Sequence, residues 1–293
     1  VEEFMALPDR PTVIKKIPRS TKTLSLPDTA DKPLLHYRRA TGDLWNLQDY
    51  FNKKIAGTRS YEKSAEKHLR QLYTMILLGM VSAFERFLKE TAAICIDQVA
   101  PYVTDDRLKD YTAPGHTLAA HFVPDNTLGK ALTELNTWID CESVNSKFRQ
   151  LLAPHHDRGS ANFYVFPQKQ DRLYKTVTET MSVIFQLRHT VAHNMGVITR
   201  ADAQKLQLLV KEAVDSPRLL NPTQVDGWSV KLFLDERAAD INNRVSDRLA
   251  ALLTELHSDN PNVFHPQSPQ VKAEELAAKF QKPINVAGTT AHP

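Results

Sequence analysis

The octet LRHTVAHN, residues 187–194, places an arginine, two histidines and an asparagine in an otherwise apolar, helix-like stretch. His189 and His193 are four residues apart, so they share one face of a helix. Arg188 and His193 are five apart and project from different sides of the axis, although both can border one groove near a helix end. Imidazole titrates near neutral pH, and the planar fork of a guanidinium suits phosphate. The octet therefore holds groups suited to acid–base chemistry beside an anion.

Two other interpretations of the octet stay open at this level. It also fits a solvated helix end, at which His193 offsets the negative end of the helix dipole. His-x3-His on a helix also places two imidazoles at a spacing that zinc accepts. A third ligand would have to come from elsewhere, and no glutamate stands between the two histidines as it does in metalloprotease helices.

Composition places the chain among globular proteins, since 42% of its 293 residues are hydrophobic and 24% are charged. The net charge of +3 permits a local basic groove but does not by itself indicate nucleic-acid binding. The two cysteines, Cys95 and Cys141, are too few for a disulfide framework and have apolar neighbours, which predicts buried thiols in a reducing cytosol. No apolar run reaches membrane-spanning length and no signal peptide is visible, so we expect a cytoplasmic protein.

Two proline-free blocks have helical spacing. In the first, which predicts a helix over residues 61–99, apolar positions step by four and three at Leu69, Tyr73, Ile76, Met80, Ala83 and Phe87. In the second, the same steps join Leu173, Val177, Thr180, Ile184, Leu187 and Val191. Asn194-Met-Gly196 is typical of a helix end, with Gly196 in the left-handed position. Thr199-x-x-Asp202 forms a capping box that opens the next helix.

Shorter elements are expected between and after these helices. Helical patterns predict helices near residues 44–55, 128–139 and 237–256. The alternation in WSVKLFL, residues 228–234, predicts a strand, and NFYVF, residues 162–166, is a second candidate strand.

The predicted architecture is mostly α, a bundle of long antiparallel helices with minor β elements. Prolines and mixed charges at the N-terminus predict an extended arm over residues 1–40, followed by a single helical domain over 41–257. Residues 258–293 are polar and proline-bearing, which predicts a flexible tail. Trp138 and Trp228 are expected in the core.

The spacing Arg188-His-Thr-Val-Ala-His193 resembles the signature of the HEPN superfamily, an arginine and a histidine separated by four to six residues. The continuation HNMGVIT resembles the ending of RNA-cleaving HEPN families. ILLGMVSAFERFLKE resembles their first core helix, with its Phe-Glu pair at Phe84-Glu85. The resemblance covers about residues 60–210, with the elements up to about 256 as an extension, and it implies a HEPN-like helical bundle.

The resemblance also implies an activity, that of an endoribonuclease which needs neither a metal nor another cofactor. It implies His193 as general acid or base and Arg188 as phosphate clamp. His189 would orient or bind the phosphate, and Asn194 would hydrogen-bond RNA or cap the helix. Glu85 has apolar neighbours on both sides, so if it is buried it needs a cationic partner, for which Arg188 and His193 are candidates.

The partners implied by the resemblance are an RNA substrate, a second copy of the chain and a regulator. The RNA can be transfer, messenger or ribosomal RNA, and two motif helices of a homodimer would face one composite cleft. Such enzymes are often toxins or effectors of antiphage or stress defence, held in check by an antitoxin or sensor protein. The alternatives are a non-catalytic HEPN-like domain that binds RNA, a nucleotide or a partner protein, and an all-helical interaction protein without RNA.

Overall fold

A computed structural model describes residues 32–56, 62–102, 107–108, 111, 127–134, 136–154, 163–168, 176–259 and 269–280. Helices dominate these residues, as the periodicity predicts. Among them, no helix has both the length and the apolar character that crossing a membrane requires.

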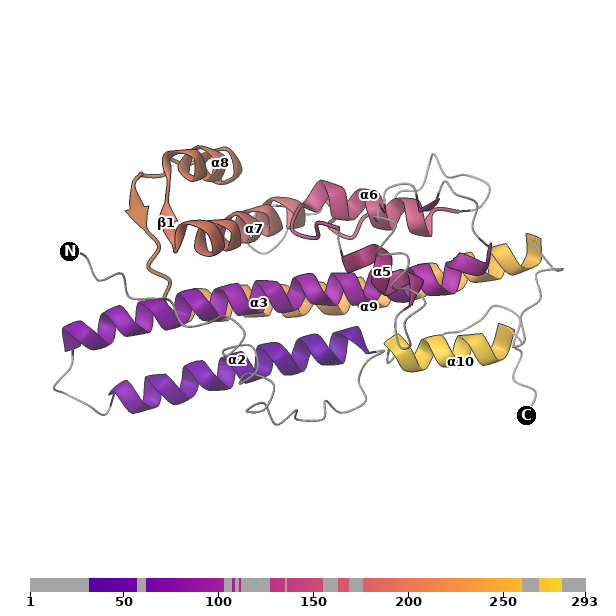
Figure 1. The fold of residues 1–293 in the computed structure, drawn as a ribbon, viewed down its shortest axis with the longest axis horizontal. Coiled ribbons are helices and arrows are strands. Elements are labelled where there is room, and N and C mark those ends of the chain that lie inside the picture. The colour runs from indigo at the N-terminus through magenta and orange to yellow at the C-terminus, as the bar shows by residue number, and fades with distance from the viewer. Residues whose placement is uncertain are drawn as a thin grey trace, which may run out of the picture. The chain divides into compact units, whose positions relative to one another are not determined.

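Three long helices form the centre of the bundle: α2 (Pro33–Ala56), α3 (Glu62–Val99) and α9 (Gln224–Asp259). Each packs against the other two. The helix predicted over residues 61–99 is therefore confirmed. α2 runs antiparallel to α3, whereas α9 runs in the same direction as α3 (Figure 1). The prediction of antiparallel long helices thus holds for α2 but not for α9.

Shorter helices surround this centre. α5 (Leu128–Glu134), α6 (Cys141–Leu152) and α7 (Val177–Asn194) pack along α3, which ends in the 3-10 turn η1 (Ala100–Tyr102). α8 (Arg200–Val210) packs on α7, and α10 (Pro269–Phe280) packs on α9 and α2 (Figure 1). β1 (Val197–Ile198) and β2 (Arg218–Leu219) pair antiparallel, with Val197 opposite Leu219. This pairing joins the connection between α7 and α8 to the segment that precedes α9.

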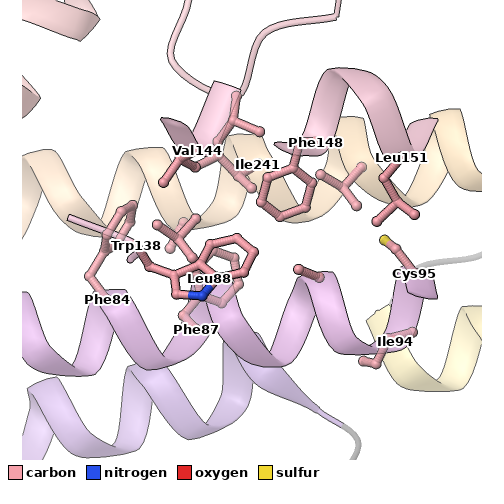
Figure 2. Close-up of a cluster of buried hydrophobic side chains, with 14 of the residues drawn as sticks. Phe84, Phe87, Leu88, Ile94, Cys95, Trp138, Val144, Phe148, Leu151 and Ile241 are labelled. Carbon is pink, nitrogen blue, oxygen red and sulfur yellow. The ribbon is translucent and has the colours of Figure 1, made fainter. Parts of the chain in front are cut away.

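The core lies where α3, α6 and α9 meet (Figure 2). Phe84 of α3 is fully buried, and its ring centroid lies 5.8 Å from that of Phe87 and 6.4 Å from that of Phe166. Trp138 is also fully buried, as predicted, and its indole N–H donates to the carbonyl of Thr133. This contact satisfies a carbonyl at the end of α5, which stops at Glu134 and not near residue 139 as the sequence predicts.

Both cysteines are free and buried, which confirms the expected buried thiols. Burial raises the pKa of Cys141 to about 12, so its thiol stays protonated at neutral pH.

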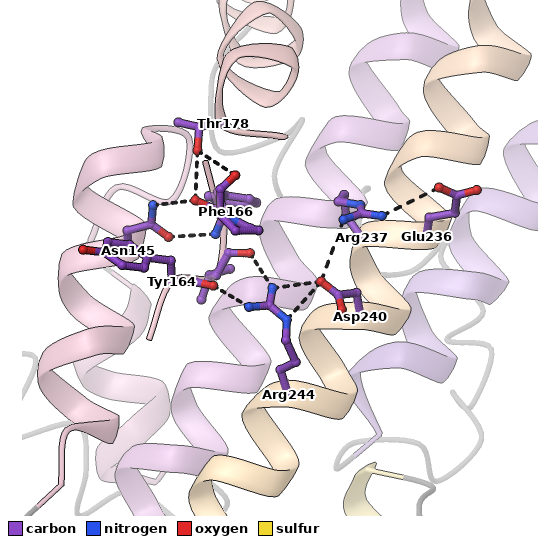
Figure 3. Close-up of polar contacts among 10 residues, drawn as sticks. Asn145, Tyr164, Phe166, Thr178, Glu236, Arg237, Asp240 and Arg244 are labelled. Carbon is purple, nitrogen blue, oxygen red and sulfur yellow. Dashed lines mark hydrogen bonds and ion pairs between the residues drawn. The ribbon is translucent and has the colours of Figure 1, made fainter. Parts of the chain in front are cut away.

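Residues 163–168 follow an irregular path and do not form the expected strand (Figure 3). Side chains from three helices satisfy their backbone groups. Asn145 of α6 accepts from the Phe166 N–H and donates to the Phe166 carbonyl, to which Thr178 of α7 also donates. Arg244 of α9 donates to the carbonyls of Tyr164 and Val165. This apolar run therefore needs no partner strand, because α6, α7 and α9 supply its hydrogen bonds.

At both ends of the described chain, a helix begins at a proline within a range that the sequence predicts to be non-helical. Pro33 is the first residue of α2, so part of the range predicted as an extended arm, 1–40, is helical. Pro269 likewise begins α10, inside the range 258–293 predicted as a flexible tail. Proline is well tolerated at the first helical position, where its missing N–H would have no intrahelical partner. Residues 1–31 lie outside the described part of the chain.

The stretch WSVKLFL is helical, and it lies within α9. Thr223 and Asp226 form a capping box at its start, and burial at Leu234, Ala238, Ile241 and Val245 follows a helical step. Seven alternating residues were too short a window to reveal this longer period. Trp228, expected in the core, is 43% exposed and lies against Trp45, with ring centroids 4.8 Å apart.

Candidate functional site at the end of α7

Defined caps place the octet in the last turns of α7. The helix opens with a capping box in which Thr176 and Glu179 satisfy each other's backbone N–H groups. It closes at Asn194, after which Met195 (φ 51°) and Gly196 (φ 84°) both adopt left-handed backbone conformations. The predicted left-handed residue is thus present at Gly196, with a second one before it.

Arg188 faces α3, where its guanidinium forms an ion pair with Glu85. The Arg188 Nη2 and Glu85 Oε2 atoms are 3.5 Å apart, and both side chains are about four-fifths buried. The same carboxylate lies 3.3 Å from Nζ of Lys89. The Nε of Arg188 is buried and has no hydrogen-bond partner among the described residues. The predicted cationic partner of Glu85 is therefore Arg188, and the guanidinium keeps a free donor.

His189 and His193 lie side by side on the same face of α7. Their ring centroids are 4.5 Å apart with the planes tilted by 45°. His193 is exposed and His189 is half-buried. Two imidazoles are therefore adjacent at one helix end, and the outer one is open to a ligand from solvent.

Within one chain, Arg188 and His193 point in different directions. Five residues correspond to about 140° around a helix, at 3.6 residues per turn. Accordingly, Arg188 turns toward Glu85 and His193 turns toward solvent. One cavity lies beside His189 and another lies beside Glu85. Neither Arg188 nor His193 lines either of these two cavities. The arginine and histidine of the motif are thus close along the chain but do not share one of these cavities.

Asn194 is held by a carboxylate that sequence reasoning did not assign to the site. Its side-chain amide donates to Asp202 Oδ2 at 2.8 Å, and Gln186 donates to Oδ1 at 3.0 Å. Asp202 also accepts from the backbone N–H and hydroxyl of Thr199, which is the predicted capping box. Asn194 therefore ties the end of α7 to the start of α8. The Thr-x-x-Asp pattern reveals the cap, but the bonds from α7 exist only after the two helices pack.

The hydrogen bonds to Asp202 outweigh the cost of burying it. Burial raises the pKa of this carboxyl, but bonds from Thr199 and Asn194 and the nearby His189 together lower it below the ordinary value. A carboxyl with a lowered pKa stabilises the fold above its unfolded-state pKa, and this contribution is lost as the pH falls through the folded-state pKa.

We expect Asp202→Asn to lower the free energy of unfolding at pH 7 by about 2 kcal/mol, because charge-assisted hydrogen bonds are lost. The difference from wild type should shrink as the pH falls below about 3.9, the ordinary aspartate value. Urea unfolding followed at several pH values measures this. Asp226→Asn is the matched control, since Asp226 caps α9 with Thr223 in the same way but is exposed. A loss equal in the two variants at every pH would show that Asp202 acts as a local cap only.

Among the described residues, no group of three or more His, Cys, Asp and Glu side chains is placed to hold a metal ion. Within this part of the chain, His189 and His193 are therefore not joined by a third side chain that could complete a metal site.

Comparisons with models of protein families, with curated proteins and with solved structures find no match to this chain. The HEPN assignment accordingly stays a prediction that depends on the motif at Arg188 and His193 and on the Phe84-Glu85 helix.

Proposed function

We propose that this chain is a metal-independent endoribonuclease whose reacting groups lie at the C-terminal end of α7. The observation that carries the proposal is a mostly buried Arg188, held by Glu85 and with an unpartnered Nε, close in the helix to two adjacent imidazoles, His189 directly after it and His193 one turn further on. The phosphate-binding and proton-transferring groups that RNA cleavage requires are thus present within six residues.

The chemistry uses the nucleophile that RNA carries. A neutral imidazole accepts the proton of the 2′-hydroxyl as its oxygen bonds to phosphorus, and a protonated one gives a proton to the departing 5′-oxygen. Arg188 offsets the negative charge that builds on the phosphate oxygens. We assign the proton transfers to the exposed His193 and phosphate orientation to His189. The products are a 2′,3′-cyclic phosphate and a 5′-hydroxyl.

A second copy of the chain completes this site. Because Arg188 and His193 lie about 140° apart around α7, one chain does not direct both at one phosphate. In a homodimer with the two α7 ends facing each other, the exposed His193 of one protomer can approach the arginine side of its partner. We propose such a composite site, in an effector of toxin or defence type controlled by a protein partner.

The runner-up is a non-catalytic domain that binds RNA, a nucleotide or a partner protein at the same helix end. The Glu85–Arg188 ion pair favours it, because a carboxylate already neutralises the guanidinium that a phosphate would need. Cleavage separates the two proposals. We expect the purified chain to cut total RNA in the presence of EDTA and to leave 2′,3′-cyclic phosphate ends. Binding of RNA without such cleavage would favour the runner-up, and 3′-hydroxyl products or loss of cleavage in EDTA would contradict the metal-free mechanism.

Under either proposal, Glu85 competes with phosphate for Arg188. We expect Glu85→Gln to tighten binding of a 2′-O-methylated RNA, which cannot be cleaved, by about ten-fold, or about 1.4 kcal/mol. It should also lower the free energy of unfolding by about 1 kcal/mol, because an ion pair that is mostly buried is lost. Fluorescence anisotropy and urea unfolding measure the two effects.

The matched control is Glu90→Gln, which removes the same charge from the same helix. Glu90 is buried to a similar extent but pairs with Arg86 and His36, not with Arg188. Equal gains in RNA affinity from the two variants would show that only net charge matters and would contradict a specific role for Arg188.

A further inference from the structure

A cavity of about 450 Å³ opens between α6, α7 and α8, beside the two histidines. Its volume lies in the range of small-molecule sites, about 300–1,000 Å³. His189 lines it from α7, and the ring of His189 in turn contacts that of His193. A ligand in this cavity would therefore sit next to the proposed reacting groups, on a different face of α7 from Arg188.

One wall of the cavity is apolar. Leu208 and Leu209 of α8 face it together with Ile139, which precedes α6. Leu208 is 80% exposed although it is a large aliphatic side chain. Aliphatic side chains at the rim of a pocket offer a flat surface against which a planar ring can lie.

Charged side chains of both signs also line the cavity. Lys205 and His189 supply cationic or hydrogen-bonding groups, and Asp140 and Glu142 supply carboxylates at the start of α6. Asp140 is fixed in place because its Oδ2 accepts from the backbone N–H of Ser143 as the helix cap. Such a lining suits a ligand that is planar, carries N–H donors at one end and is anionic at the other.

We propose that this cavity binds a guanine nucleotide of the RNA substrate, an inference that rests on the proposed function. The base lies against Leu208 and Leu209, and its N1–H and N2–H₂ groups donate to the carboxylate of Glu142, because Oδ2 of Asp140 already accepts from Ser143. The phosphate faces Lys205 and His189. Guanine fits this lining better than the other bases because its Watson–Crick edge presents two adjacent N–H donors, which one carboxylate can accept together.

The test is direct binding of mononucleotides, measured by titration calorimetry with the full chain. We expect guanosine 3′-monophosphate to bind at least about ten-fold more tightly than uridine 3′-monophosphate, a discrimination of the size that one well-placed pair of base contacts supplies. Glu142→Gln should abolish this preference. Glu134→Gln, which changes an exposed carboxylate outside this cavity, should retain it. Leu208→Ser should weaken both nucleotides to the same extent, and its exposed position leaves the core intact.

Nucleotide binding by the His193→Ala variant, compared with RNA cleavage by the wild-type chain, separates this inference from the proposed function. Guanine-selective binding that depends on Glu142, together with a wild-type chain that cuts no RNA, would support the site and contradict the ribonuclease. Failure of both nucleotides to bind, equal affinity for the two, or a preference that survives Glu142→Gln would overturn the site even if RNA is cleaved.

Discussion

Replacing His193 with alanine is expected to lower the rate of RNA cleavage about 1,000-fold without unfolding the chain. General acid–base catalysis by one side chain contributes about 10²–10⁴ to a rate. The side chain of His193 is exposed at the end of α7, so its removal leaves no cavity in the core. Cleavage of an end-labelled RNA in EDTA measures the rate, and circular dichroism checks the fold.

The matched control for His193 is His257→Ala, a histidine in the last turn of another helix, α9. Its rate should equal that of wild type. Added imidazole should restore part of the activity of His193→Ala, because a free base can enter the space that the side chain leaves. An unchanged rate in His193→Ala would remove this histidine from the mechanism. If EDTA abolishes cleavage by the wild-type chain and added zinc restores it, the result would instead support the metal interpretation of His189 and His193.

The fold was most predictable where one helix has one long apolar stripe and a marked end. The stripes of α3 and α7 extend over several turns, so local sequence specifies these helices. The Thr199–Asp202 box likewise fixes the start of α8. Prediction failed where one residue type has two roles, as at Pro33 and Pro269, since a proline that ends one helix is also a suitable first residue of another. It also failed in residues 163–168, whose hydrogen-bond partners lie on three distant helices.

In the candidate site, too, some contacts could be predicted from the sequence and others could not. The approach of Glu85 to Arg188 was predictable, because a carboxylate amid the apolar residues of one core helix needs a cation from another. The role of Asp202 and the cavity beside His189 were not, because they depend on the angle at which α8 packs on α7 and on the place of α6. Residue types and spacing thus predict which groups take part, whereas tertiary packing decides which of them face one another.

The largest effect on stability is expected at Gly129, where α5 packs against α3 without room for a side chain. A Cβ added there would lie 2.1 Å from the carbonyl oxygen of Ala93 and 2.7 Å from its carbonyl carbon. Both are backbone atoms, so no rotamer change relieves the clash. The N–H of Gly129 also donates to Oδ1 of Asp97 at 2.7 Å, and this bond holds the two helices at that distance. We expect Gly129→Ala to lower the free energy of unfolding by about 3 kcal/mol, the upper part of the range for overpacking.

Urea unfolding followed by circular dichroism measures the effect of Gly129→Ala, and Gly42→Ala is its matched control. Gly42 also lies inside a helix, α2, but a Cβ added there would meet nothing within 4 Å. Alanine at this position should therefore raise the free energy of unfolding by about 0.5–1 kcal/mol, because glycine weakens a helix interior by that amount. The two substitutions are chemically identical, so opposite signs isolate the contact with Ala93. A stabilised or unchanged Gly129→Ala would mean that α5 does not approach α3 this closely, and the positions of Trp138 and α6, which follow α5 in the chain, would have to be revised with it.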